Sequence, residues 1–316
     1  MKQLSLATGT KNKWFKTLLN DVLRDRYLYL LLIPALAHLL IFRYSPMFGL
    51  KIAFLDYNAF KGVGGSEWVG LEHFITFFQG PYVWRLIRNT LIINIYSLVF
   101  SFPAPLIIAL AFNELKPSSK IRKVGLGISY MPHFISSVII VGIAISVLSP
   151  STGVLNNIRS LMGLDRIYYL NDAKYFRTIY TTMNIWKSAG FGSIIYIAAL
   201  AGVDQHLYEA VDIDGGGRWA KLFHVSIPSI APTIIIMFIM RMGNMFETGY
   251  ESIMLLYSPN TYETADVIQT FVYRNGIQNF QYSFASAVGL FQSLVGLVLV
   301  YLANLISRRV SEVSLW

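Results

Sequence analysis

The sequence contains no cysteine and few charged residues. Without cysteine the chain has no disulfide framework, no thiolate metal site and no cysteine nucleophile. Charged residues make up 14% of its 316 residues, against about 25% in an average soluble domain. Hydrophobic residues make up 54%, and the mean hydropathy is +0.51. A water-soluble fold could not bury that much apolar surface, so the composition predicts a protein of the lipid bilayer.

Motifs for nucleotide binding and catalysis are also missing. No G-x-x-x-x-G-K-[ST] phosphate loop is present, because the glycines at 215–217 are followed by Arg218 and Trp219 and the cluster at 62–65 lacks the lysine and the hydroxyl. The five histidines are scattered without metal-ligand spacing, and no Ser/His/Asp arrangement is recognisable. We therefore expect a chain that binds no cofactor and is not itself an enzyme.

The formal net charge of +9 does not indicate nucleic-acid binding. The 26 Lys and Arg residues are spread over many short segments and form no aromatic-laced basic stripe. Membrane topology explains them better, because cytoplasmic loops carry an excess of Lys and Arg.

Six apolar stretches are candidate membrane spans, and nothing shows the alternation typical of a membrane β-barrel. Their approximate limits are Tyr27–Phe42, Asn89–Phe112, Val124–Leu148, Tyr175–Val203, Val225–Gly249 and Ser283–Ile306. Helices are expected because a chain in lipid must satisfy its backbone hydrogen bonds internally. The predicted fold class is an all-α membrane protein with six transmembrane helices, within a membrane domain at 27–306.

Positive charge predicts the orientation. A basic segment at 1–26 precedes the first span, which lacks small-residue cleavage chemistry and is expected to remain as an anchor rather than a cleaved signal peptide. The short second connection carries Lys116, Lys120, Arg122 and Lys123. These features predict that both termini, including a tail at 307–316, lie in the cytoplasm, and that the loops at about 43–88, 149–174 and 250–282 lie outside.

The segment between the fourth and fifth spans, at about 204–224, predicts a helix, a turn and a second helix. Residues 209–213 continue a helical pattern, three consecutive glycines at 215–217 allow a sharp bend, and an amphipathic run resumes at Arg218 before Pro228 enters the membrane. Gly215 is expected to need positive φ, and Asp214 is expected to cap the following turn. The simpler alternative is an ordinary solvated loop.

This segment resembles the cytoplasmic EAA loop of ABC importer permeases. The pattern E-A-A, two residues, D-G-A and a later apolar-Pro entry is matched by Glu209, Ala210, Asp214, Gly215 and Pro228. The sequence departs from it at Val211 and Gly216, where the family usually has Ala. The resemblance implies that Glu209, Ala210, Asp214, Gly215 and Gly216 couple the chain to a separate ATPase.

The resemblance extends over nearly the whole chain, to the carbohydrate-importing branch often called LplB-type. Matching segments include Pro46-Met47-Phe48-Gly49, Trp68-Val69-Gly70-Leu71, Asn89-Thr90-Leu91, Ala265-Asp266-Val267-Ile268 and Ala285-Ser286-Ala287-Val288-Gly289-Leu290. It implies the type I ABC importer permease fold, a multi-pass position in a bacterial plasma membrane and an oligosaccharide substrate. Implied partners are a second permease chain, two ATPase subunits that bind ATP and Mg, and an extracellular solute-binding protein.

Polar residues within the spans are candidates for a substrate path, because such residues are costly in lipid. They are Asn184, Lys187, Arg241, Asn244 and Glu247. Arg241, Asn244 and Glu247 recur every three residues, so one helix face is expected to carry them. The alternatives are an internal ion pair between Arg241 and a carboxylate such as Glu247, or a Lys187 that extends to the membrane interface.

Aromatic residues add candidates for contact with sugar rings, namely Trp186, Tyr196 and Tyr250. Their alternative role is anchoring at the membrane interface. Rival functions are a permease for a non-sugar substrate, a secondary transporter and a membrane enzyme. A secondary transporter usually shows inverted repeats with broken helices, and a membrane enzyme needs a convergent acid, base or metal set; neither pattern is visible.

Overall fold

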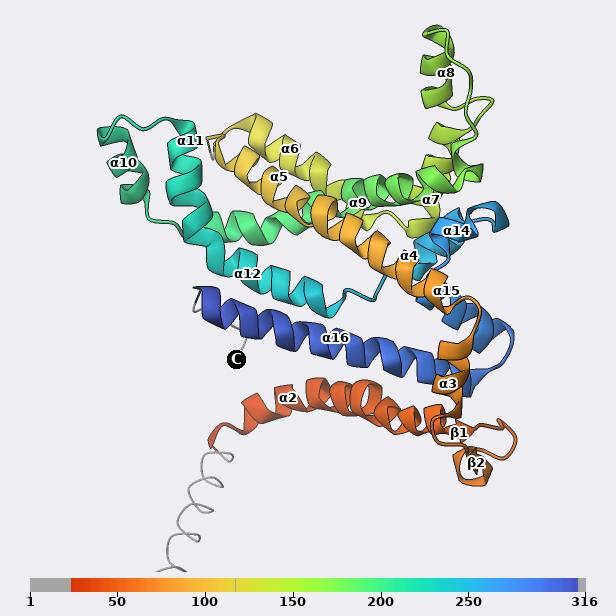
Figure 1. The fold of residues 1–316 in the computed structure, drawn as a ribbon. Coiled ribbons are helices and arrows are strands. Elements are labelled where there is room, and N and C mark those ends of the chain that lie inside the picture. The colour runs from red at the N-terminus through yellow and green to blue at the C-terminus, as the bar shows by residue number, and fades with distance from the viewer. Residues whose placement is uncertain (1–23, 117, 312–316) are drawn as a thin grey trace, which may run out of the picture.

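A computed structural model describes residues 24–116 and 118–311, without the side chains of residues 310 and 311, and most of it is helical (Figure 1). The predicted basic segment at 1–26 therefore lies mostly outside the described residues, as does half of the predicted tail at 307–316. One small sheet is present in the described part, in which β1 (Leu55–Asp56) pairs antiparallel with β2 (Glu67–Trp68) and Leu55 lies opposite Trp68.

Most of the helices follow one another with short connections. The first half of the chain contains α2 (Arg26–Leu39), α3 (Glu72–Gln79), α4 (Val83–Tyr96), α5 (Pro103–Asn113), α6 (Lys120–Tyr130), α7 (Ser137–Leu148) and α8 (Val154–Leu161). The second half contains α9 (Ala173–Ala201), α10 (Gln205–Ile213), α11 (Arg218–Lys221), α12 (Ile227–Gly243), α13 (Tyr250–Leu256), α14 (Tyr262–Ala265), α15 (Ile268–Tyr273) and α16 (Tyr282–Ser311).

Short π-helical and 3₁₀ turns join several of these helices or lie between them. The π-helical turns are Leu40–Tyr44, Ser97–Ser101, Leu222–Ser226 and Arg274–Gln278. The 3₁₀ segments are Ser45–Phe54, Val63–Gly65, Met131–Phe134, Tyr169–Asn171 and Pro259–Thr261.

Four continuous helical runs of the described chain are long and apolar enough to cross a membrane. They are Arg26–Phe54, Val83–Asn113, Arg218–Gly243 and Tyr282–Arg309. Two bent helix pairs pass the same test when each is taken together: Lys120–Phe134 with Ser137–Leu148, and Ala173–Ala201 with Gln205–Ile213. The helical class is thus confirmed, with four to six candidate spans.

The predicted third span, Val124–Leu148, is wrong as a single helix. It breaks between Phe134 and Ser137, where the two parts meet at 103°. Pro132 lies in the 3₁₀ turn at the break and has no N–H for a helical hydrogen bond. Ser136 then begins α7 as its N-cap, since its Oγ accepts from the N–H of Ile139 at 3.4 Å.

The limits of two other predicted spans also differ from the structure. The first helical run continues past Phe42 to Phe54, and Pro46 lies near the start of the 3₁₀ segment that follows the π-helical turn Leu40–Tyr44. The fifth begins at Arg218 and ends at Gly243 instead of running from Val225 to Gly249. The second helix of the 204–224 segment is therefore continuous with a candidate span.

The long helices α5, α9, α12 and α16 lie side by side, with α2 at one edge (Figure 1). One buried apolar cluster joins α7, α9 and α13, a second joins α3, α4, α15 and α16, and a third joins α5, α9 and α12. Helices α12 and α16 approach closely, because a Cβ on Gly296 would lie 2.8 Å from the Gly243 carbonyl oxygen.

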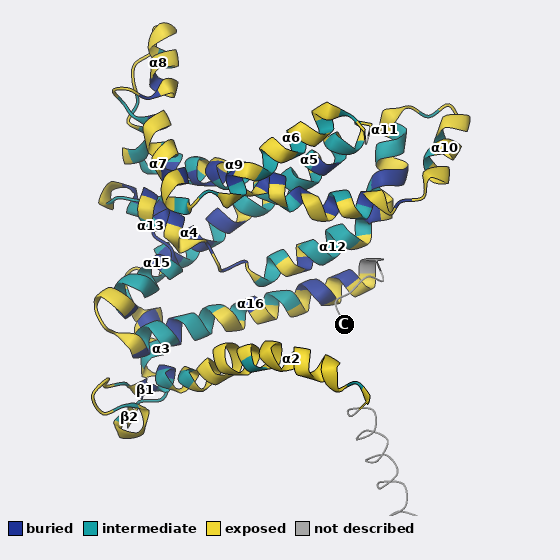
Figure 2. Cartoon of the chain, turned by 180° about the vertical axis from the view of Figure 1, so that it is seen from behind, coloured by how far each residue is buried: buried dark blue, intermediate teal, exposed yellow. Residues whose placement is uncertain are grey.

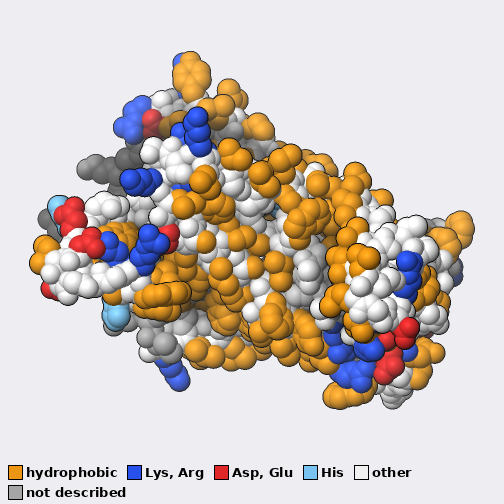
Figure 3. All heavy atoms as spheres, turned by 90° about the horizontal axis from the view of Figure 1, so that it is seen from above, with side chains coloured by type: hydrophobic (Ala, Val, Ile, Leu, Met, Phe, Trp, Pro, Cys, Tyr) orange, Lys and Arg blue, Asp and Glu red, His pale blue; other side chains and the backbone are white. Residues whose placement is uncertain are grey.

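Exposed apolar surface is extensive, as expected of a protein in lipid. Helix α2 has no buried residue, and Figure 2 shows it exposed along its length. Seen from above, charged side chains gather toward the two ends of the molecule and the surface between them is largely hydrophobic (Figure 3). This distribution matches an apolar zone between two aqueous ends.

Candidate functional site

A cavity of about 490 Å³ lies among the long helices. Its walls come from α4 and the π-helical turn at 97–101, from the start of α5, from α9, from α12 and from residues 244–249. Helix α9 lines it with residues four apart along one face: Tyr180, Asn184, Ser188, Gly192 and Tyr196. The cavity has the size of a small-molecule site and a polar lining inside candidate membrane helices.

Arg241 is the cationic residue in the lining of this cavity. Its guanidinium donates to Ser97 Oγ at 2.7 Å and to Asn94 Oδ1 at 3.4 Å. Both acceptors are neutral, and the ion pairs of the described residues include none between Arg241 and Glu247. The predicted alternative, an Arg241–Glu247 ion pair, is therefore wrong, although the Glu247 carboxylate lines the same cavity and interacts with the Arg241 charge over a longer distance.

The expectation that Arg241, Asn244 and Glu247 share one helix face is wrong. Helix α12 ends at Gly243, Asn244 is its C-cap, and the chain then turns, with the N–H of Glu247 donating to the Asn244 carbonyl at 3.0 Å. All three residues nevertheless line the same cavity. Gly and Asn are frequent at helix ends, so the Gly243-Asn244 pair was a signal in the sequence that the helix stops there.

Of the other predicted path residues, the structure places two in the wall of this cavity and three outside it. Asn184 and Tyr196 line the cavity, whereas Trp186, Lys187 and Tyr250 do not. Trp186 is two residues from Asn184 on α9 and so points to the opposite side, where 47% of its surface is exposed. Lys187 Nζ donates to Ser137 Oγ of α7 at 2.9 Å, so a neighbouring helix holds it. Tyr250 lines a different cavity.

Sequence reasoning missed seven polar residues of the cavity wall: Asn94, Ser97, Ser101, Tyr180, Thr181, Ser188 and Thr248. Asn94 and Ser97 hold Arg241, and Ser188 and Tyr180 come from α9. The Tyr180 hydroxyl donates to the Thr248 carbonyl, which fixes the turn after α12. Asn94 and Ser97 lie three residues apart in a largely apolar span, and that spacing was the available signal.

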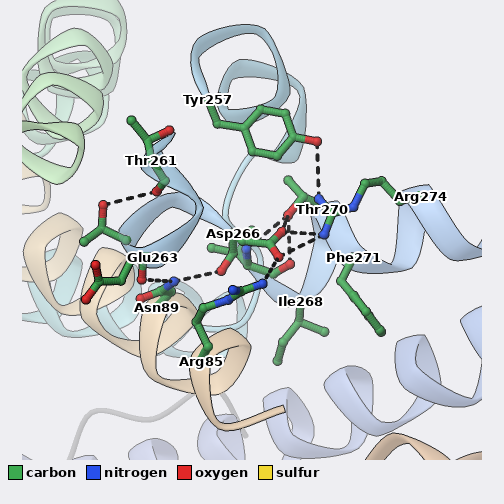
Figure 4. Close-up of polar contacts among 12 residues, drawn as sticks. Arg85, Asn89, Tyr257, Thr261, Glu263, Asp266, Ile268, Thr270, Phe271 and Arg274 are labelled. Atoms are coloured by element: carbon green, nitrogen blue, oxygen red, sulfur yellow. Dashed lines mark hydrogen bonds and ion pairs between the residues drawn. The ribbon is translucent and has the colours of Figure 1, made fainter. Parts of the chain in front are cut away.

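A second polar centre surrounds Asp266, which is fully buried between α14 and α15 (Figure 4). Its carboxylate forms ion pairs with Arg85 of α4 at 3.1 Å and with Arg274 at 2.8 Å. Thr270 Oγ1 donates to Asp266 Oδ1 at 2.8 Å. A buried carboxylate needs this much pairing to offset its lost hydration, so the three contacts act as one unit.

The Asp266 centre fastens the 257–274 segment to the long helices. Asn89 of α4 donates to the carbonyls of Glu263 at 2.9 Å and Asp266 at 3.0 Å, and accepts from Arg177 of α9 at 3.0 Å. Burial alone would lower the pKa of Arg274, but a hydrogen bond with Tyr257 and the charge of Asp266 raise it above its usual value. The guanidinium therefore stays charged and the network intact at neutral pH.

The 204–224 segment forms the predicted helix, turn and helix at one end of the molecule (Figure 1). Asp204 begins α10 as its N-cap, accepting from the N–H of His206 at 2.9 Å. Gly215 has φ +74°, as expected of the bend. A Cβ on Gly216 would lie 2.5 Å from Val211 Cγ1, so a larger residue here would require the Val211 side chain to shift.

The predicted capping role of Asp214 is wrong. Asp214 is the C-cap of α10, the N-cap of α11 is Gly217, and no hydrogen bond of the described residues involves the Asp214 carboxylate. The turn is held instead by an ion pair of 2.6 Å between Lys221 and Asp212. The hydroxyls of Tyr208 and Ser226 lie 3.0 Å apart and join α10 to the base of α12.

The exposed side of this segment carries both charged and large apolar residues. Glu209 and Ala210 are exposed. The exposed fractions of Ile213 and Trp219 are 86% and 73%, which leaves large apolar side chains uncovered next to charged ones.

Comparisons with known proteins agree with this architecture. Residues 101–312 match the family described as binding-protein-dependent transport system inner membrane component. The chain is 42% identical over 312 residues to protein LplB of Bacillus subtilis, covering 98% of this chain and 96% of that one. It is 38% identical over 301 residues to the polygalacturonan/rhamnogalacturonan transport system permease protein YteP of the same organism, covering 95% and 94%.

A solved structure is similar over almost the whole chain. It is the crystal structure of a bacterial ABC transporter involved in the import of the acidic polysaccharide alginate, with a TM-score of 0.85, 45% identity and coverage of 93% of this chain and 99% of that one. A second structure of the alginate transporter is in complex with alginate pentasaccharide-bound periplasmic protein, again at a TM-score of 0.85. The chain therefore belongs to the family of binding-protein-dependent transport system inner membrane components, the multi-pass permease subunits of ABC importers.

Proposed function

We propose that this chain is one of two permease subunits of an ATP-driven importer that carries an acidic oligosaccharide into a bacterial cell. In this proposal an extracellular solute-binding protein delivers the saccharide, and two ATPase subunits supply the energy. Similar proteins support it: YteP is named for transport of polygalacturonan/rhamnogalacturonan, and the alginate transporter imports an acidic polysaccharide. The complex of that transporter with a periplasmic protein supports the binding-protein partner.

The observation that carries the substrate class is the environment of Arg241. Its guanidinium donates to Ser97 and Asn94, which are neutral, and it forms no ion pair with the Glu247 carboxylate of the same cavity, so its positive charge is available to a ligand there. A carboxylate is the complementary group, because Arg binds carboxylates through charge-assisted, often bidentate hydrogen bonds. The amides of Asn184 and Asn244 supply donors and acceptors for sugar hydroxyls.

In the proposed topology six spans cross the membrane and both termini are cytoplasmic. The two bent helix pairs each account for one crossing, with α10 at the cytoplasmic end of α9. The membrane domain is 27–306, flanked by the segment 1–26 and the tail 307–316. The basic run Lys120–Lys123 at the start of α6 supports this orientation, because positive residues favour the cytoplasmic side.

We propose that the α10–α11 turn is the coupling element, through Glu209, Ala210, Asp214, Gly215 and Gly216. This turn projects from the long helices (Figure 1) and carries exposed apolar residues. It is also attached to the start of α12 through Tyr208 and Ser226, so an ATPase bound to it could move α12. ATP and Mg belong to the partner subunits in this account. Helices α11 and α12 form one helical run, so a displacement of the turn would also move the end of α12 that carries Arg241.

The experiment is uptake by the importer reconstituted in liposomes with its partner chains and binding protein. Oligogalacturonates and alginate oligosaccharides are compared with neutral maltooligosaccharides of the same length. The proposal expects ATP-dependent uptake of an acidic saccharide and little uptake of the neutral ones. Uptake of neutral saccharides alone would contradict the substrate class, and uptake driven by an ion gradient without ATP would contradict the importer type.

A further inference from the structure

A second cavity, of about 410 Å³, is formed by the first residue of α13, by α15 and the turn that follows it, and by the first half of α16. Its polar wall consists of Tyr250, Tyr273, Tyr282, Gln269, Ser286 and Gln292. The described residues that line it carry no formal charge, in contrast to the cavity of Arg241 and Glu247.

The tyrosines present flat apolar surface together with free hydroxyl groups. The rings of Tyr250 and Tyr273 stack with centroids 5.8 Å apart and planes 29° apart, and Tyr282 meets Tyr57 edge-on at 6.3 Å. Within the described chain no hydrogen bond involves the hydroxyls of Tyr250, Tyr273 or Tyr282. Ring faces with a polar edge suit a ligand that has both an apolar face and hydroxyl groups.

The two glutamines offer one donor and one acceptor in fixed positions. Gln269 Oε1 accepts from the N–H of Thr248 at 2.8 Å and from its hydroxyl at 3.2 Å, which leaves the amide nitrogen as a donor. Gln292 Nε2 donates to the Phe246 carbonyl at 3.1 Å, which leaves the amide oxygen as an acceptor. The backbone partners fix which end of each amide is free, so the pair is pre-oriented.

One stretch of backbone separates the two cavities. Glu247, Thr248 and Gly249 line the Arg241 cavity, and the next residue, Tyr250, lines the second. Thr248 is bonded on both sides, since its carbonyl accepts from Tyr180 of the first cavity and its N–H donates to Gln269 of the second. The two cavities are therefore adjacent, and the backbone at 247–250, held in place by the hydrogen bonds of Thr248, forms the wall between them.

We infer that the second cavity is a further saccharide subsite, which binds a sugar residue by its ring face and hydroxyl groups rather than by charge. The inference rests on the proposed function, because it places a second unit of the same oligosaccharide next to the unit held at Arg241. Sugar rings have C–H faces that pack on tyrosine, and their hydroxyls both donate and accept. The rings of Tyr250 and Tyr273 form the surface on which the sugar ring packs, and Gln269 and Gln292 orient the sugar through its hydroxyl groups.

The absence of cysteine in the sequence allows a direct occupancy test. Ser286→Cys puts a single thiol of this chain in the second cavity, Ser188→Cys puts one in the Arg241 cavity, and Ser293→Cys serves as a control two turns further along α16 and outside both. The reconstituted importer is labelled with a maleimide during turnover, with and without alginate or galacturonate pentasaccharides. Labelling of this chain is then followed on a gel.

The inference predicts that a pentasaccharide slows labelling of Ser286→Cys and Ser188→Cys and leaves Ser293→Cys unchanged. Protection of Ser188→Cys alone would overturn the second subsite and leave the proposed function intact. Protection of neither thiol by either pentasaccharide would overturn both. Protection of Ser286→Cys alone would support the subsite and contradict the substrate role of Arg241.

A ring-deletion series gives an independent measurement. Tyr273→Ala should lower uptake of the pentasaccharide at limiting concentration by roughly threefold to tenfold, since an aromatic stacking contact is lost. Tyr273→Phe keeps the ring and should stay near wild type, as should Tyr301→Ala, an exposed tyrosine of α16 outside the cavity. If Tyr273→Ala instead prevents assembly with the second permease, the cavity is a subunit contact and the inference is wrong.

Discussion

The Arg241 guanidinium lies 2.7 Å from Ser97 Oγ, and this hydrogen bond joins α12 to the π-helical turn between α4 and α5. This π-helical turn interrupts the regular backbone hydrogen bonding of the span, and Ser97 at its first position accepts the hydrogen bond from Arg241. Arg241 belongs to the helical run that begins at Arg218 in the proposed coupling element. A movement of the turn at 214–217 would therefore also displace Arg241, because one helical run connects the two.

Reporter fusions test the topology. Fusions at Lys120 and Trp219 should report the cytoplasm, and fusions at Lys61 and Arg166 should report the outside, because the basic start of α6 favours the cytoplasmic side. An outside signal at Trp219 would contradict both the topology and the coupling role of α10 and α11.

Substitutions at Gly215 test the coupling element. Gly215→Val forces a β-branched residue to adopt φ +74° and should lower uptake and weaken its coupling to ATP hydrolysis, with normal membrane insertion. Gly215→Asn is the matched control, because Asn tolerates positive φ far better. Uptake and ATPase rate are measured together on the reconstituted complex.

Glu209→Lys is a second test of the same element, as it reverses an exposed charge without altering the turn. We expect reduced association with the ATPase, because charge complementarity across the contact is lost. Unchanged uptake in both Gly215→Val and Glu209→Lys would mean that another part of the chain transmits the motion.

Asp266→Asn tests the buried centre. Removing this carboxylate leaves Arg85 and Arg274 without their partner, and breaking a buried pair in this way costs about 3–5 kcal/mol. We expect a lower thermal unfolding temperature in detergent and faster proteolysis near 257–274. Asp172→Asn is the control: it alters an exposed pair with Lys174 that contributes about 0–1 kcal/mol. Equal stability of the two variants would contradict a structural role for Asp266.

The sequence predicted local features well. The three glycines predicted the bend at Gly215, and the apolar stretches predicted the positions of the candidate spans, because span length and glycine conformation follow from neighbouring residues. Two breaks were missed although both had local signals, Pro132 before α7 and Gly243-Asn244 at the end of α12. The hydrophobic pattern runs through both breaks and hides them.

Contacts between distant segments were beyond sequence reasoning. Asp266 meets Arg85 across 181 residues, and Arg241 meets Ser97 across 144. A single sequence carries no local pattern for such pairs. Arg241 was found because a charge inside a span is rare, but the partner considered for it as an alternative was Glu247, since a nearby carboxylate is the usual counter-charge. The turn after Gly243 changes that geometry.

The central claim is that Arg241 binds the acidic group of the substrate, and uptake by Arg241 variants tests it most directly. Arg241→Gln should lower uptake of an acidic oligosaccharide by roughly tenfold to a hundredfold, because a charge-assisted hydrogen bond is lost. Arg241→Lys should retain more activity, and Glu247→Gln should not lower uptake as strongly. Amounts of assembled complex and binding-protein-stimulated ATPase rates are measured in parallel. Loss of acidic-saccharide uptake in an assembled Arg241→Gln complex is the predicted result; uptake equal to wild type, or loss only through failed assembly, would contradict the account.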